Sequence, residues 1–184
     1  MKKFIFTAIV IFIALGNANA IHLEDSQVQP VAYVRLAPIK ATMQKFNQSL
    51  QAIKPGPQST MMSASIGLML GDPTYGSFDE KENLALYLFN DFTDKREPSV
   101  VAFVKVSPDS PMKAAFKKNK ALALQDYKGW TIITNRPDTL KKIGNLAPLL
   151  KHARTQAKDD LEAGAFIPTL LGTPMINKQI AEGL

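Results

Sequence analysis

Two apolar segments that lie close together in the chain constrain the fold more than any other feature of the sequence. They are residues 84–90 and 99–106, which are rich in the aliphatic and aromatic side chains that strands prefer. Only the polar stretch 91–98 separates them. A parallel connection needs a dozen or more residues, whereas antiparallel strands can be joined by a short turn. The spacing therefore predicts an antiparallel hairpin.

The segments before this hairpin predict one strand and two helices. Residues 31–37 carry β-branched and aromatic side chains, as is typical of a strand. Residues 39–53 instead place apolar side chains three or four positions apart, which is the spacing of an amphipathic helix, and Pro55-Gly56-Pro57 ends it. Residues 59–70 predict a second, more buried helix, with Gly71 as its C-terminal stop.

A second hairpin is predicted between residues 121–126 and 130–135, because the loop 127–129 is short and contains a glycine. Trp130 leads an alternating face of its strand with Ile132, so we expect its side chain to be largely buried. Two more helices are expected around this hairpin. One begins at Pro111 with Asp109 or Ser110 as its cap, and the other begins at residue 137 and is kinked or restarted by Pro148. A strand at 161–167 and a helix at 168–180 are expected to follow.

This order of elements predicts an α+β fold, in which a mostly antiparallel sheet has its helices packed on one face. A ferredoxin-like or related two-layer sandwich is the expected architecture, and 184 residues with 46% hydrophobic side chains suffice for its core. We expect the chain to be incomplete at its C-terminus. The expected divisions are a signal peptide at 1–20, a linker at 21–30, the α+β domain at 31–158, and the truncated start of a further strand–helix unit at 159–184.

The first twenty residues have the three parts of a secretory signal peptide. Lys2 and Lys3 are followed by the mostly apolar run 4–15, and Ala18-Asn19-Ala20 provides the small residues of a cleavage site. The apolar run is shorter than the roughly 18 residues that span a bilayer, so no transmembrane span is expected after cleavage. The mature chain would begin at Ile21, where a lipoprotein would carry cysteine. We therefore expect a periplasmic or secreted bacterial protein.

Several short motifs resemble a module of uncharacterised secreted bacterial proteins of unknown function. They are the Gly71-Asp72-Pro73 turn, the hairpin that follows it, and Lys128-Gly129-Trp130 leading into a helix near Asp138. In that module a turn containing glycine and aspartate precedes a hairpin, a short helix and a strand that begins with Gly-Trp. The resemblance covers about residues 60–150 and implies an α+β unit that is often repeated in tandem. It implies no catalytic or binding residues.

The residues that most enzyme classes require are missing from the sequence. Cysteine is absent, which excludes disulfide scaffolds, cysteine-based metal sites and thiol nucleophiles. The two histidines are His22 and His152, and His152 is expected to be solvated on a basic helix. No Gly-x-Ser-x-Gly, His-Glu-x-x-His, Gly-x-Gly-x-x-Gly or phosphate-binding loop motif occurs. We therefore assign no catalytic, cofactor-binding or metal-binding residue.

Two acidic clusters keep one enzymatic alternative open, namely a carboxylate-dependent secreted hydrolase. The first contains Asp72, Asp79, Glu80 and Glu82, and the second is 159–162. The first cluster does not fit a calcium loop, because placing Gly76 at the sixth position leaves Gly and Pro where side-chain ligands belong. The first cluster is expected to be a solvated loop before a strand, and the second, Asp159-Asp160 with Glu162, the polar start of a strand, although sequence alone leaves carboxylate pairing open.

Positive charge is concentrated between residues 113 and 158, which contain eleven basic residues and only two acidic ones. Such asymmetry favours contact with an anionic partner. The stretch has few aromatic residues for base stacking, so specific nucleic-acid binding is not expected. We predict a non-enzymatic binding or structural module whose partner is an anionic envelope surface or another protein. The expected contact residues are Lys117, Lys118, Lys141, Lys142, Lys151 and Arg154.

Overall fold

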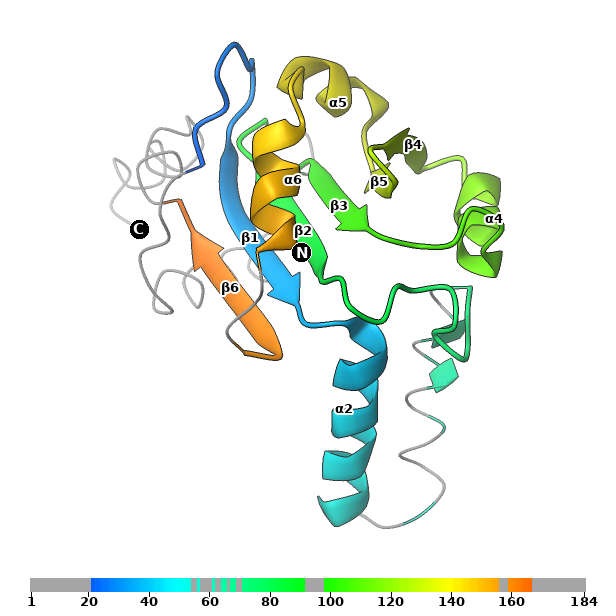
Figure 1. Ribbon diagram of the computed structural model, residues 1–184. Helices are drawn as coiled ribbons and strands as arrows, with labels where there is room; N and C mark the ends of the chain where they lie inside the picture. Colours follow the sequence, from blue (N-terminus) through cyan, green and yellow to red (C-terminus); the bar gives the residue numbers. More distant parts are fainter. Residues whose placement is uncertain are drawn as a thin grey trace, which may run out of the picture.

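The computed structural model shows an antiparallel sheet with four labelled helices around it (Figure 1). The signal peptide expected at 1–20 and the helix expected at 168–180 lie outside the described residues. None of the helices in the described part of the chain is long and apolar enough to cross a membrane. The structure describes residues 21–53, 56, 61, 64–65, 67–68, 71–91, 98–155 and 159–166.

Six strands form one sheet in the order β4-β5-β3-β2-β1-β6, and every neighbouring pair is antiparallel. Both predicted hairpins are confirmed, because β2 pairs with β3 and β4 pairs with β5. The strands are β1 (Pro30–Leu36), β2 (Leu84–Phe89), β3 (Val100–Val104), β4 (Ala123–Tyr127), β5 (Trp130–Thr134) and β6 (Leu161–Ala165).

The predicted α+β class with an antiparallel sheet is confirmed. The order of elements is not that of a ferredoxin-like domain, in which β-α-β-β-α-β units place another strand between the two parallel strands of each split βαβ unit. The sheet here is a related arrangement in which consecutive strands mostly turn back on one another. The described helices are α2 (Ile39–Ile53), α4 (Pro111–Lys118), α5 (Pro137–Ile143) and α6 (Ala147–Arg154).

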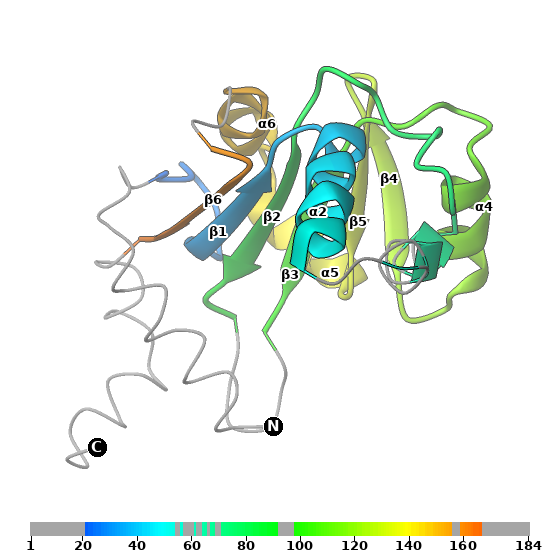
Figure 2. The same cartoon turned by 90° about the horizontal axis from the view of Figure 1, so that it is seen from below.

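Helices contact both faces of the sheet, not one face as predicted. Ile143 of α5 and Leu149 of α6 belong to the larger apolar cluster, which contains Phe103. Ile39 of α2 and Met112 of α4 belong to a second cluster, which contains Val104. Successive strand residues point to opposite faces, so the two clusters lie on opposite sides of β3. Figure 2 shows α6 and α4 at opposite ends of the sheet.

Local sequence signals set the bounds of the helices. Ser110 accepts a hydrogen bond from the backbone N–H of Lys113 and caps α4, and Pro111 occupies the first turn as predicted. Gly144, with φ of 68°, ends α5, and Pro148 lies in the first turn of α6. The expectation that Pro148 restarts the helix is therefore confirmed.

Gly71 ends the helical stretch before it, although most of the helix expected at 59–70 lies outside the described residues. Its φ is +74°, and its N–H donates to the carbonyl of Leu68. The next N–H, from Asp72, donates to the carbonyl of Gly67. These two bonds and the positive φ form a Schellman motif, so the predicted stop at Gly71 is confirmed.

The β4–β5 hairpin turns over two residues, Lys128 and Gly129, with φ of 50° and 78°. Positive φ at both positions is the signature of a type I′ turn, whose twist matches that of the strands. Tyr127 and Trp130 therefore face each other across the turn. Trp130 is 2% exposed, which confirms its predicted burial.

Two expected boundaries within the chain differ from those observed. Residues 21–30 are not a free linker, because Leu23 and Val28 are buried in the larger cluster and Gln27 donates its backbone N–H to the carbonyl of Lys142. The strand expected to begin a further unit is β6, and it pairs with β1 in the same sheet. Pairing between strands that are far apart in the chain cannot be predicted from the local sequence of either strand.

Candidate functional site

The six basic residues expected to contact a partner lie on three helices and do not share one surface. Lys117 and Lys118 are on α4, Lys141 and Lys142 on α5, and Lys151 and Arg154 on α6. Helices α4 and α6 contact opposite faces of the sheet at opposite ends, as both views show (Figures 1 and 2). In addition, Lys142 forms an ion pair of 3.0 Å with Asp138.

A groove of about 400 Å³ lies between β4 and α5, and Lys141 is the basic side chain in its lining. The strand contributes small, aliphatic and amide side chains, and the helix contributes Pro137 and Leu140. Strand β4 is the first strand in the sheet order, so α5 borders a sheet edge here. The lining residues are Ala123, Leu124, Gln125, Pro137, Leu140, Lys141 and Gly144.

Further positive charge lies close to β4. Lys113 of α4 approaches the carboxylate of Asp126 to 2.6 Å and holds the pKa of that carboxyl below its usual value. The charge of Lys117, on the same helix, adds a smaller effect in the same direction. Lys120 precedes β4 by three residues, and Lys128 follows its last residue directly.

We call Lys117, Lys120, Lys128 and Lys141 the basic rim. All four are exposed, and none forms an ion pair with another described residue. The structure thus brings two of the six expected residues, Lys117 and Lys141, to the same strand. Lys120 and Lys128 were not selected from the sequence, although their positions at the two ends of a predicted hairpin strand are the signal that would have found them.

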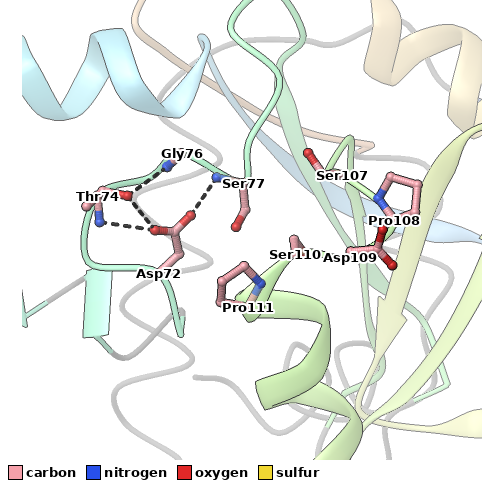
Figure 3. Close-up of a pocket in the computed structure, with 9 residues that line it drawn as sticks. All are labelled: Asp72, Thr74, Gly76, Ser77, Ser107, Pro108, Asp109, Ser110 and Pro111. Carbon is pink, nitrogen blue, oxygen red and sulfur yellow. Dashed lines mark hydrogen bonds between the residues drawn. The ribbon is translucent and has the colours of Figure 1, made fainter.

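A second, polar pocket of about 280 Å³ lies between the loop at 72–77 and the loop that leads into α4 (Figure 3). Hydroxyl groups and two carboxylates line it. Figure 3 shows the carboxylate of Asp72 turned toward its own loop. The lining residues are Asp72, Thr74, Gly76, Ser77, Ser107, Pro108, Asp109, Ser110 and Pro111.

Asp72 serves to hold its loop in shape. Its carboxylate accepts hydrogen bonds from the backbone N–H of Ser77 at 2.6 Å and from the N–H and hydroxyl of Thr74 at 3.1 and 2.9 Å. Burial by itself raises the pKa of Asp72, but the hydrogen bonds from Ser77 and Thr74 together outweigh it and lower the pKa to about 2. A carboxylate with such a low pKa is a weak base and is not protonated at neutral pH, so Asp72 does not suit general acid–base catalysis.

The other carboxylates of the two acidic clusters are mostly in ion pairs. Lys105 lies 3.4 Å from Asp79 and 3.1 Å from Glu82, and Lys40 pairs with Glu80. Across the sheet, Asp160 pairs with Lys45 at 2.6 Å and Glu162 with Arg35 at 2.6 Å. Among the described residues, no group of three or more histidine or acidic side chains is placed to hold a metal ion.

A buried polar network joins α6 to β1 and β6. Arg35 is 5% exposed and donates to the carbonyls of His152 and Thr155 as well as to Glu162. The hydroxyl of Tyr33 donates to the same Glu162 oxygen at 2.8 Å. Burial and this acidic partner raise the pKa of Tyr33 to about 12. The network ties the helix to the sheet.

His152 belongs to this network and is not the solvated side chain that we expected. Its ring meets that of Tyr33 edge-on, with 4.6 Å between the ring centroids, and its Nδ1 contacts the hydroxyl of Tyr87. Burial lowers the pKa of His152 to about 4, and the nearby charge of Arg35 acts in the same direction. The ring is therefore neutral at physiological pH. The sequence did not reveal this because the two tyrosines lie on other elements.

Comparisons of the chain with protein-family models, with curated proteins and with solved structures found no match in any of the three. The resemblance to secreted bacterial α+β modules therefore stays a prediction. The features of the structure that bear on function are the groove, the basic rim and the polar pocket.

Proposed function

We propose that this protein is an exported bacterial binding module, without catalytic activity, that holds an anionic partner in the envelope or outside the cell. The observation that carries the proposal is the groove between β4 and α5, with Lys141 in its lining and three further lysines near the same strand. Lysines near one another raise the local positive potential and attract anions. The expected contact surface is therefore the basic rim and not the whole basic segment 113–158.

Export is supported by the residue types at the start of the chain. Basic residues, an apolar run and Ala18-Asn19-Ala20 match a cleavable secretory signal. Leu23, a buried residue of the core, follows the expected cleavage site and so remains in the mature chain. The mass of the protein recovered after expression with its own leader tests this part, with a first residue of Ile21 expected. A retained leader in the exported protein would contradict it.

Binding is tested with two anionic probes that separate a membrane from a protein partner. Vesicles that contain phosphatidylglycerol report contact with an anionic surface, and poly-glutamate reports contact with an acidic chain. Binding is expected at low ionic strength and should weaken as salt is added, because exposed charges are screened over about 10 Å at 0.1 M. Retention of either probe at low salt supports the proposal, and absence of both overturns it.

Charge-reversed variants locate the contact. The pair Lys120→Glu and Lys141→Glu should weaken binding at least tenfold, since it reverses two of the four rim charges. The pair Lys151→Glu and Arg154→Glu is the matched control, because both side chains are exposed on α6 and the change in net charge is the same. Equal losses from the two pairs would show that only net charge matters, and the basic rim would not be the site.

A further inference from the structure

Strand β4 has one side that no other strand pairs within the described part of the chain. The residues that flank a two-residue hairpin turn, here Tyr127 and Trp130, exchange hydrogen bonds with each other. In an antiparallel pair such residues alternate with residues whose backbone groups point the other way. The N–H and C=O groups of Leu124 and Asp126 therefore point away from β5, toward the edge.

We infer that β4 takes up an extended acidic peptide as an additional strand, with the basic rim binding its carboxylates. This inference rests on the proposed function and names the class of partner. Main-chain hydrogen bonds to an exposed strand are an established mode of peptide recognition, with side chains of the surroundings giving specificity. The partner is thus an acidic segment of another protein.

Among the described residues, β4 is regular and two of its side chains are exposed. The side chains of Gln125 and Asp126 are exposed, and the pairing of β4 with β5 runs through all five residues without a bulge. Proteins commonly protect such edges with proline, a bulge, charged side chains or a covering helix, and of these the charged side chains are also what would recognise an acidic partner. The described sequence of β4, ALQDY, contains no proline. A partner segment of about five residues, roughly 17 Å long, would match it.

Helices border the edge on both faces of the sheet. On one face, Pro137 and Leu140 of α5 line the groove with apolar surface, next to Lys141. On the other face, Lys113 of α4 forms an ion pair of 2.6 Å with Asp126, and Lys117 is an exposed residue of the same helix. Alternate side chains of an added strand would point to these two faces. An acidic side chain on the α5 face would therefore point toward Lys141, and one on the other face would point toward the helix that carries Lys117.

Charge complementarity selects the occupant. Asp126 is neutralised by Lys113, so the edge itself presents mainly the positive charge of the basic rim. A second copy of this chain, paired edge to edge, would bring two basic rims together, and like charges placed opposite each other are destabilising. An acidic extended segment removes this repulsion and uses the same backbone groups.

The test uses a labelled peptide of alternating valine and glutamate, five residues long, and its fully N-methylated analogue. Both carry the same charge, but the analogue has no N–H groups to donate to β4. Fluorescence anisotropy with the mature protein should show at least tenfold weaker binding of the analogue. Equal affinities of the two peptides would overturn strand addition while leaving charge contact, and so the proposed function, in place.

A pair of protein variants tests the same step from the other side. Leu124→Pro removes an N–H that points to the edge and none that β5 uses, whereas Leu124→Ala removes the side chain and keeps the N–H. Peptide binding should fall at least tenfold further in Leu124→Pro than in Leu124→Ala. Emission from Trp130 verifies that both variants are folded. If vesicles bind and the peptide does not, the partner is a membrane and the inference is wrong.

Discussion

The hydroxyl of Tyr87 lies 2.8 Å from Nδ1 of His152 and 3.0 Å from the carbonyl oxygen of Leu149. These contacts join α6 to β2, and both Tyr87 and Leu149 belong to the larger apolar cluster. Burial strongly raises the pKa of Tyr87, so the hydroxyl stays protonated. The histidine ring also stays neutral, because burial and the positive charge of Arg35 both lower its pKa, to about 4.

Stability should therefore depend on pH in the range where unfolded histidine titrates. The pKa of His152 is about 4 in the folded protein and about 6.5 when unfolded, so between these values the unfolded chain binds the extra proton. The free energy of unfolding should fall as pH drops from 6.5 toward 4. Between pH 7.5 and 5 the loss should be on the order of 1 kcal/mol, since the half-buried ring remains partly screened.

Urea denaturation at several pH values, followed by Trp130 emission, measures this dependence. His152→Gln should flatten the curve between pH 5 and 7, because the titrating ring is removed. His22→Gln is the matched control, since His22 is exposed, and it should leave the slope unchanged. An unchanged slope in His152→Gln would mean that another group carries the effect.

The ion pair of Arg35 and Glu162 should contribute more to stability than its counterparts on the surface. Arg35→Met removes a guanidinium whose side chain is 6% exposed and leaves the carboxylate of Glu162 without that partner. The free energy of unfolding should fall by about 3 kcal/mol. Lys45→Met, which breaks the exposed pair with Asp160, should cost less than about 1 kcal/mol. Similar costs in the two variants would contradict the role given to the buried network.

The N-terminal segment should stabilise the fold. Leu23 is 2% exposed within the larger cluster, so Leu23→Ala leaves a cavity and should lower the free energy of unfolding by about 2 to 4 kcal/mol. Glu24→Ala, at the exposed neighbouring position, should change it by less than about 0.5 kcal/mol. Chemical denaturation decides the matter, and a neutral Leu23→Ala would restore the linker interpretation.

Two glycines with positive φ should respond differently to alanine. At Gly71 a new Cβ would come within 2.6 Å of the Cβ of Ala115 in α4, whereas at Gly129 it would meet nothing within 4 Å. Both changes strain the backbone by about 1 kcal/mol, and the clash at Gly71 adds about 1 to 3 kcal/mol. Thermal unfolding should therefore show the larger loss for Gly71→Ala. Equal losses would mean that α4 shifts freely away from the loop.

Much of the candidate site lay beyond prediction from the sequence. The concentration of lysines between residues 113 and 158 was visible in the sequence. That the lysines of α4 and those of α6 lie on opposite sides of the molecule depended on which face of the sheet each helix covers. Lys141 borders β4 because α5, which follows the β4–β5 hairpin in the chain, packs beside β4. The neutral state of His152 depended on its burial, in contact with Tyr33 and Tyr87, and on the nearby charge of Arg35, all of which are far from it in the chain. Contacts of this kind form only when the sheet assembles.

The sequence by itself determined where both hairpins and the described helices lie. Hydrophobic periodicity placed the strands and helices, and Ser110, Pro148 and the Lys128-Gly129 turn act through neighbouring backbone groups, so their effects are local. Only the tertiary structure decided that β6 pairs with β1, that residues 21–30 enter the core, and that β4 is left at the edge beside α5. Strand order is set by the joint burial of apolar faces from segments that are far apart in the chain. No local sequence pattern shows which of these segments will pack together.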